Sequence, residues 1–250
     1  MSLSEPVRVG GVAAAELDEV ARHAEGWSPQ EVLSWALERF HPRIAFASSF
    51  GVEDVADIDM LAGLRADARV FTLDTGRLPV ETYDVMERVR ERYGLPLEVY
   101  APERQPLELL QRERGFYSFR ASVEERKRCC GVRKVEPLGR ALRGLEAWIT
   151  GLRREQSVTR TAVPVVEVDR GNGGIVKVNP LAAWTEAQVW AYVRARGVPY
   201  NRLHDQGYPS IGCAPCTRAI APGEDARAGR WWWENPDTKE CGLHRAAAPR

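Results

Sequence analysis

The sequence predicts an α/β protein with a mostly parallel sheet and helices on both faces of that sheet. Two observations favour this class. Short apolar segments alternate with segments of helical periodicity, and the apolar segments tend to end in small polar residues or glycine. At 250 residues the chain is long enough to bury the core of one large domain of this kind.

The first two pairs of strand and helix come early in the chain. RIAFASSF, at 43–50, predicts a strand, and the segment 53–64 that follows predicts a helix. The apolar residues of this helix recur at helical spacing, at Val55, Ile58, Leu61 and Leu64. ARVFTLDTG, at 68–76, predicts a second strand, and 79–94 predicts a helix that starts with proline and stops at glycine.

The later elements continue the alternation. Strands are predicted at 97–102 and 146–152, and helices at 105–115, 124–144 and 185–197. The segment 165–180 predicts a hairpin around Gly-Asn-Gly-Gly. In a parallel sheet of this kind, ligands bind outside the C-terminal ends of the strands, so the turns that follow the strands are the first places to look for chemistry.

We divide the chain into three segments. Residues 1–40 are expected to be an N-terminal helical segment, and 41–205 the α/β domain with its nucleotide site. Residues 206–250 are rich in Gly, Pro and Trp and lack clear periodicity. We expect this last segment to pack on the α/β domain rather than to form a domain of its own.

The charge balance gives no reason to expect nucleic acid or a membrane as a partner, because 35 Lys and Arg balance 35 Asp and Glu. No stretch approaches about 18 uninterrupted apolar residues, and the N-terminus lacks the basic start and apolar run of a signal peptide. We therefore expect a soluble, cytoplasmic protein. Thiols stay reduced in that compartment, so the five cysteines suggest metal binding or catalysis rather than disulfides.

Two turns at the same sheet edge suggest a nucleotide site. In FASSFGVED the small residues Ser48, Ser49 and Gly51 let backbone N–H groups and a helix N-terminus approach an anion. The turn LDTG, from Leu73 to Gly76, should lie beside it. An ordinary turn with a capping serine would look similar, and neither turn matches the glycine-rich phosphate motifs.

Basic residues cluster in four places, although the net charge is zero. The clusters lie at 111–120, 124–134, 151–160 and 224–230. If the fold brings them together they would make a strong anion site, whereas each cluster alone would be an ordinary solvated helix face.

Four of the cysteines form two pairs. Cys129 and Cys130 are adjacent, and Cys213 and Cys216 have the CxxC spacing. Zinc sites space both pairs by two to four residues, because both sulfurs must reach one ion at about 2.3 Å. Neighbouring side chains point in different directions, so an adjacent pair suits two iron corners of a cubane better. We favour a [4Fe–4S] cluster over zinc and over four unrelated buried cysteines.

The fifth cysteine, Cys241, lies near the C-terminus among basic residues. Lys239, His244 and Arg245 would lower the pKa of its thiol and raise the thiolate fraction. A reactive cysteine on a movable segment and a passive tail cysteine both fit this position.

These motifs together resemble a known family. KRCCGVRKVEPL, GCAPCTR, RWWWENPDTKECGLH and SSFGVED are similar to the motifs of the assimilatory adenylylsulfate reductases, the iron–sulfur members of the phosphoadenylylsulfate reductase family. The resemblance runs from about Arg43 to His244. It implies the adenine nucleotide alpha hydrolase-like fold for the α/β domain.

The resemblance implies reduction of adenosine 5′-phosphosulfate to sulfite and AMP in sulfate assimilation and cysteine biosynthesis. Cys241 would be the catalytic nucleophile and carry the sulfur as a thiosulfonate, which a separate thioredoxin then discharges. One [4Fe–4S] cluster per chain would be held by Cys129, Cys130, Cys213 and Cys216. The family also implies a homo-oligomer.

The resemblance further implies which residues bind the substrate. They are Ser48, Ser49, Gly51, Leu73, Thr75, Gly76, Lys134, Gly151, Arg153, Arg227, Arg230 and His244.

Three alternatives stay open. The substrate could carry a 3′-phosphate, or both forms could be accepted. An ATP-pyrophosphatase such as a tRNA thiolase has the same fold, but its first turn typically reads Ser-Gly-Gly-x-Asp-Ser, unlike the turn here. A nucleotide-binding sensor without catalysis would not need Cys241.

Overall fold

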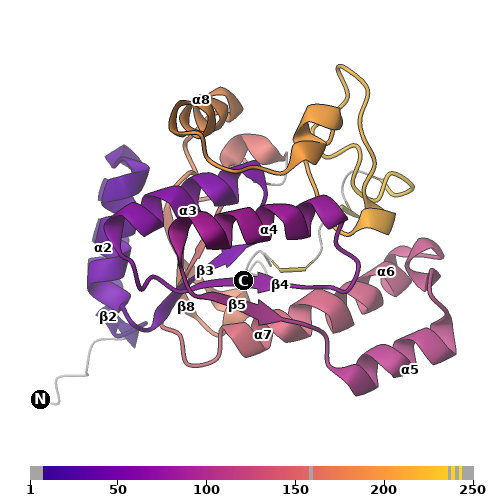
Figure 1. The fold of residues 1–250 in the computed structure, drawn as a ribbon. Coiled ribbons are helices and arrows are strands. Elements are labelled where there is room, and N and C mark those ends of the chain that lie inside the picture. Colours follow the sequence, from indigo (N-terminus) through magenta and orange to yellow (C-terminus); the bar gives the residue numbers. More distant parts are fainter. Residues whose placement is uncertain (1–7, 158–159, 236–237, 240–241, 244–250) are drawn as a thin grey trace, which may run out of the picture.

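A six-stranded sheet lies at the centre of the computed structural model, which describes residues 8–157, 160–235, 238–239 and 242–243 (Figure 1). The strand order is β5-β4-β3-β6-β8-β7. Only the edge strand β7 runs antiparallel to its neighbour within this sheet. The strands are β3 (Ile44–Ser48), β4 (Val70–Leu73), β5 (Leu97–Tyr100), β6 (Ala147–Thr150), β7 (Val166–Asp169) and β8 (Ile175–Val178).

Helices cover both faces of the sheet (Figure 1). They are α1 (Ala14–His23), α2 (Pro29–Phe40), α3 (Val52–Leu64), α4 (Val80–Tyr93), α5 (Arg104–Arg114), α6 (Val123–Cys130), α7 (Glu136–Ala141) and α8 (Glu186–Arg196). A short hairpin of β1 (Arg8–Val9) and β2 (Val12–Ala13) precedes them.

The alternation of side chains along each strand separates two cores. Phe46 and Ile149 face the larger core, which includes residues of α2, α3, α4 and α8. Ala45 and Trp148, which precede them in sequence, face the other side of the sheet, as does Phe71 of β4. These three residues pack against α7 and the turn after it. Because successive strand residues point to opposite faces, both faces are apolar and both need a covering layer of helices.

The predicted α/β architecture is confirmed. The four predicted parallel strands became β3, β4, β5 and β6, and the hairpin predicted at 165–180 is the β7–β8 pair. The helix predicted over 124–144 is interrupted, since a π-helical turn, Gly131–Val135, separates α6 from α7. Two helices, α1 and α2, lie within residues 1–40. The division into three segments stays a prediction.

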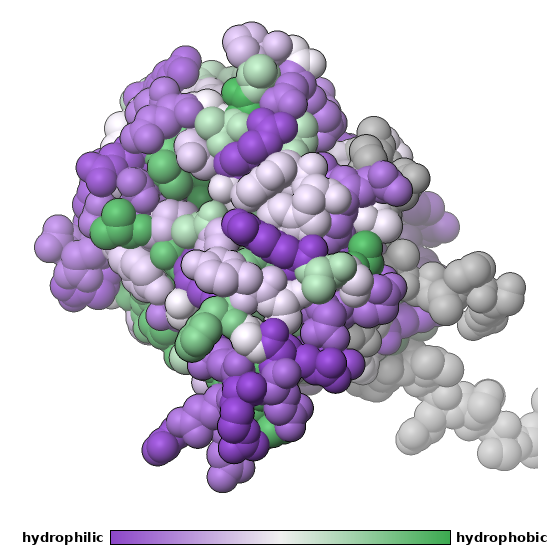
Figure 2. Space-filling view, turned by 90° about the vertical axis from the view of Figure 1, so that its right-hand side faces the viewer, coloured by the Kyte–Doolittle hydropathy of each residue, from purple (hydrophilic) through white to green (hydrophobic). Residues whose placement is uncertain are grey.

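A third, smaller core lies beside the sheet, where α5, α6 and the C-terminal loops meet at the right of Figure 1. It contains all four paired cysteines together with Leu110, Phe119 and Trp231. The outer face of this region is mostly hydrophilic, with small separate hydrophobic spots (Figure 2). None of the helices in the described part of the chain has both the length and the apolar character needed to cross a membrane.

Candidate active site

A cavity of about 230 Å³ lies at the C-terminal ends of β3, β4 and β6. This is where a parallel sheet of this topology is expected to bind its ligand. The predicted substrate-binding residues that line it are Ser48, Ser49, Gly51, Leu73, Thr75, Lys134, Gly151, Arg153, Arg227 and Arg230. Gly76 is not among the lining residues, and Cys241 and His244 lie outside the described residues.

The first turn of the cavity is held by its own side chains. The Ser48 hydroxyl accepts a hydrogen bond from the Phe50 N–H at 3.0 Å. Asp54 accepts from the Ser49 backbone N–H at 2.5 Å and from the Ser49 hydroxyl at 2.8 Å. Phe50 has φ +57°, a conformation that non-glycine residues rarely adopt outside functional turns. The Ser49 hydroxyl proton is therefore engaged within the turn itself.

Asp54 and Gly151 approach each other closely across the cavity floor. A Cβ atom on residue 151 would lie 2.2 Å from the Asp54 Oδ1 atom, so only glycine fits at the end of β6. Burial raises the pKa of Asp54 to about 6, against the lowering effect of its two hydrogen bonds from Ser49. The carboxyl group of Asp54 therefore changes charge near neutral pH.

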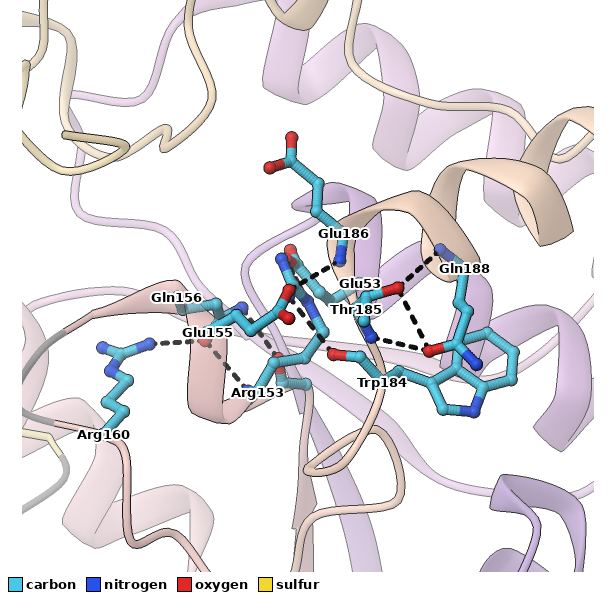
Figure 3. Close-up of polar contacts among 10 residues, drawn as sticks. Glu53, Arg153, Glu155, Gln156, Arg160, Trp184, Thr185, Glu186 and Gln188 are labelled. Carbon is cyan, nitrogen blue, oxygen red and sulfur yellow. Dashed lines mark hydrogen bonds and ion pairs between the residues drawn. The ribbon is translucent and has the colours of Figure 1, made fainter. Parts of the chain in front are cut away.

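Arg153 is buried in a polar network that joins the ends of β6 and the start of α8 (Figure 3). Its guanidinium donates to Glu53 Oε1 at 2.8 and 3.0 Å and to the Trp184 carbonyl at 3.4 Å. Glu155 lies 3.5 Å from the same guanidinium and accepts from the Glu186 N–H. The Arg153 charge is thus offset by carboxylates, and its guanidinium holds the loop in shape.

Four other cationic side chains line the same cavity, namely Lys134, Arg160, Arg227 and Arg230. Arg230 donates to the Ser210 hydroxyl at 3.2 Å and stacks on the Trp231 ring at 4.8 Å. The Nε of Arg230 is buried and has no hydrogen-bond partner among the described residues. Arg227 donates to the Lys239 carbonyl at 2.6 Å. With Lys134, these residues give this part of the cavity the character of an anion site.

The four paired cysteines line a second cavity, of about 20 Å³, next to the first. All four are buried and none forms a disulfide. The lining also includes four cationic residues and two aromatic ones, namely Arg77, Arg126, Arg133, Lys134, Phe119 and Trp231. Lys134, which lies in the π-helical turn directly after α6, lines both cavities.

The turn LDTG stands between the two cavities. Cys213 Sγ lies 3.3 Å from the Thr75 hydroxyl, and Arg133 donates to the Thr75 carbonyl at 2.5 Å. The Ala214 N–H donates to the Arg77 carbonyl at 2.8 Å. The CxxC segment is thus joined to the end of β4.

The lining of this cavity bears on which metal centre the four cysteines could hold. Within the described ranges no three or more Cys, His, Asp and Glu side chains group closely enough to hold one metal ion. Burial raises the pKa of Cys216 to about 12 and also raises that of Cys129. Four buried thiolates would need compensation, which the four cationic side chains around the cavity can supply. The donor set and its charge therefore fit an iron–sulfur cluster.

Sequence reasoning missed several residues of the larger cavity. Trp148, Glu53, Asp54, Arg160 and Leu243 all line it. Glu53 and Asp54 belong to the motif FASSFGVED and Arg160 to a basic cluster noted in the sequence, so local signals existed for these three. Trp148 lies within a predicted strand, where an aromatic residue is expected to pack in the hydrophobic core and gives no signal of a binding site.

The chain is similar to proteins of one known family. The family model of the phosphoadenosine phosphosulfate reductase domain matches residues 43–219. The chain is 57% identical over 208 residues to the adenosine 5′-phosphosulfate reductase of Allochromatium vinosum, which covers 83% of this chain and 81% of that relative.

Solved structures show the same fold. A phosphoadenylyl-sulfate reductase from Candida auris, in complex with phosphate, has a TM-score of 0.71 at 31% identity, over 86% of this chain and 100% of that chain. Yeast FAD synthetase in complex with FAD has a TM-score of 0.55 over 82% of this chain and 67% of its own; at 15% identity it is a likeness of fold alone.

Proposed function

Since the chain belongs to the phosphoadenosine phosphosulfate reductase family, we propose that it reduces adenosine 5′-phosphosulfate to sulfite and AMP in sulfate assimilation. One observation carries the proposal beyond the family. A cationic cavity at the C-terminal strand ends shares a wall, and the residue Lys134, with the cavity of the four cysteines. This arrangement supports an anion site where the substrate nucleotide and the cysteine centre would meet.

The chemistry explains the cationic side chains. A thiolate that attacks a sulfate ester brings two negative charges together, so positive groups must be fixed in place before the reaction. Lys134, Arg227 and Arg230 supply them, and Arg230 has a buried N–H with no partner among the described residues. We assign these three to the phosphosulfate, and the turns at Ser48–Gly51 and Leu73–Gly76 to the nucleotide.

The reaction has two stages. The Cys241 thiolate attacks the sulfate sulfur, the bond from that sulfur to the phosphate oxygen breaks, and AMP leaves with the electron pair of that bond. The product on the enzyme is a Cys241 thiosulfonate. A thioredoxin thiolate then attacks the Cys241 sulfur and releases sulfite, and the second thioredoxin thiol resolves the mixed disulfide. Thioredoxin thus supplies both electrons, and His244 would lie close to the substrate during the first stage.

We propose that Cys129, Cys130, Cys213 and Cys216 hold one [4Fe–4S] cluster. When bound, the cluster would stabilise this part of the fold and tune the electrostatics beside the phosphosulfate. The cationic side chains Arg77, Arg126, Arg133 and Lys134 would offset its negative charge.

We assign the substrate without a 3′-phosphate. Besides the cationic residues, the carboxylates of Glu53, Glu155 and Glu186 line the cavity. A second phosphate on the ribose would add negative charge to a cavity that already holds these groups. The name of the relative from Allochromatium vinosum supports the same assignment. A cytoplasmic location and a homo-oligomer stay predictions.

The decisive experiment is the intact mass of the reduced protein after incubation with adenosine 5′-phosphosulfate, or with its 3′-phosphorylated form, in the absence of thioredoxin. We expect a gain of one SO3 group that maps to Cys241 and is removed by thioredoxin, and faster formation from the first substrate. The control is Cys241→Ser, which should bind nucleotide but form no adduct. An adduct on another residue, or none in wild type, would refute the proposal.

A further inference from the structure

The side chain of Arg126 is fully buried in the middle of α6, the helix that ends with the adjacent cysteines. Its guanidinium donates to both carboxylate oxygens of Glu234, at 2.8 and 2.9 Å. The Glu234 side chain is only 4% exposed. The same guanidinium donates a further hydrogen bond to the carbonyl of Thr238 at 2.6 Å. This is a bidentate, charge-assisted pair with a backbone contact added to it.

The same guanidinium touches the wall of the substrate cavity. Arg126 stacks on the ring of Trp231 at 4.6 Å, and Arg230 contacts that ring at 4.8 Å. Trp231 and Arg230 both line the larger cavity, while Arg126 and Trp231 line the cysteine cavity. Arg126 therefore contacts, directly or through one ring, both cavities and the segment that follows Trp231.

That segment leads toward the nucleophile. Thr238 precedes Cys241 by three residues, and a chain of three residues spans at most about 10 Å. Further contacts hold the backbone nearby: Arg227 donates to the Lys239 carbonyl, and the Thr238 hydroxyl donates to Glu234 at 3.1 Å. Thr238, which precedes Cys241 by three residues in the sequence, is thus held by contacts of the described chain.

We propose that Arg126 and Glu234 form a clamp whose function is to position the C-terminal segment, so that Cys241 reacts at the cavity. The inference rests on the proposed function. It assigns Arg126 and Glu234 as positioning residues, because neither has to touch the substrate. The clamp would also link the cysteine centre to the segment that contains Cys241, since Arg126 lies on the same helix as Cys129 and Cys130.

Stability alone does not account for this pair. Replacing both members of a buried ion pair by apolar residues of similar size is often neutral or stabilising, whereas removing only one leaves an uncompensated charge. A lysine at position 126 would keep the charge, but a single ammonium cannot reproduce the planar fork that reaches Glu234 and Thr238 together. Replacing Arg126 by lysine, or both members of the pair by apolar residues, therefore removes the contacts of the clamp without leaving a buried charge unpaired.

The test uses Arg126→Lys and the double variant Arg126→Met with Glu234→Met, in the full chain. Four quantities are measured: iron per chain, the dissociation constant for adenosine 5′-phosphosulfate, the first-turnover rate of SO3 transfer to Cys241, and the rate of tryptic cleavage after Lys239. We expect nucleotide affinity within about threefold of wild type, and the transfer rates are compared per iron-loaded chain, because Arg126 also lines the cysteine cavity. We expect SO3 transfer to slow by about 100-fold, the usual effect of a small misplacement of a reacting group.

Tryptic cleavage after Lys239 reports on the segment without requiring catalysis. We expect both variants to be cleaved at least about tenfold faster than wild type, because local opening controls such cleavage. The matched control is Arg69→Met, which removes a partly buried pair with Glu98 at 2.8 Å, between β4 and β5, away from the segment. It should change neither the rate of SO3 transfer nor cleavage after Lys239.

The outcomes separate the two proposals. If wild type forms no adduct, the proposed function fails, whatever the cleavage rates are. If wild type forms the adduct and the variants transfer SO3 at the wild-type rate, the clamp is refuted. A transfer rate that falls only in proportion to iron content, with unchanged cleavage, would also refute it, because Arg126 would then act on the cysteines alone.

Discussion

At the scale of single residues, one close approach shapes the floor of the site. Gly151, at the end of β6, leaves no room for a Cβ atom beside Asp54, and Asp54 in turn orders the serine turn through Ser49. The backbone of two strands that are neighbours in the sheet is thereby fixed at the position where a nucleotide would bind. The identity of this glycine follows from a contact and not from a turn conformation.

We expect Gly151→Ala to destabilise the protein by about 1–3 kcal/mol, the usual cost of overpacking, and to weaken nucleotide binding by about tenfold. Urea unfolding and nucleotide titration measure the two effects. Gly63→Ala is the matched control: no atom lies within 4 Å of the added Cβ, so this exposed helix position should gain about 0.5–1 kcal/mol. Equal stability of Gly151→Ala and wild type would contradict the close approach.

At the scale of elements, the start of α3 concentrates acidic side chains at the cavity. Asp57 is fully buried and both of its carboxyl oxygens lack a hydrogen-bond partner among the described residues. Burial raises its pKa well above the ordinary value, with the charges of Asp54 and Glu53 adding to the effect. Burial thus favours the protonated form of Asp57, while the pKa of Asp54 lies at about 6.

This arrangement predicts a pH dependence of stability with a definite sign. The pKa of Asp54 rises from 3.8 to about 6 on folding. Below about pH 4 the carboxyl is protonated in both the folded and the unfolded state, so its burial does not lower the free energy of unfolding. As the pH rises from 4 through 6, the free energy of unfolding falls progressively, because the unfolded state releases this proton first. The full cost is about 3 kcal/mol. Asp54→Asn should therefore gain stability relative to wild type between pH 4 and 7, as measured by urea unfolding. A difference that is constant across this range would contradict the assignment.

At the scale of the whole molecule, the fold brings together segments that are distant in sequence. The adjacent cysteines are the last two residues of α6. The CxxC pair lies far along the chain, in a segment that is joined to the end of β4 through Thr75 and Arg77. Basic residues of three separate clusters meet around the two cavities. The neutral net charge of the chain hides this local concentration.

The two cysteine roles should separate experimentally. Anaerobically purified wild type should be brown and hold about four irons per chain. Cys213→Ser should lose most of the iron, because one of the four thiolates is missing, whereas Cys241→Ser should keep it. Iron analysis and visible absorption measure both. Colourless wild type with one zinc per chain would refute the cluster.

Much of the site could be predicted because its signals are local. Parallel strands end at one edge, so the turns after β3 and β4 had to lie near each other, and the cysteine spacing alone favoured a cluster. The signals for Arg126 are not local. The basic run around Arg126 predicts an exposed, solvated side chain. Its partner Glu234 lies 108 residues further along the chain.

The sequence by itself determined the alternation of strands and helices, the edge of the sheet where the larger cavity lies and the family to which the motifs belong, because these depend on periodicity and short spacings. Only the tertiary structure decided that Arg153 is neutralised by Glu53, that Arg126 is buried against Glu234, and that Lys134 borders both cavities. The physical reason is that the state of a charged side chain depends on which distant groups replace its water, and that is set by packing.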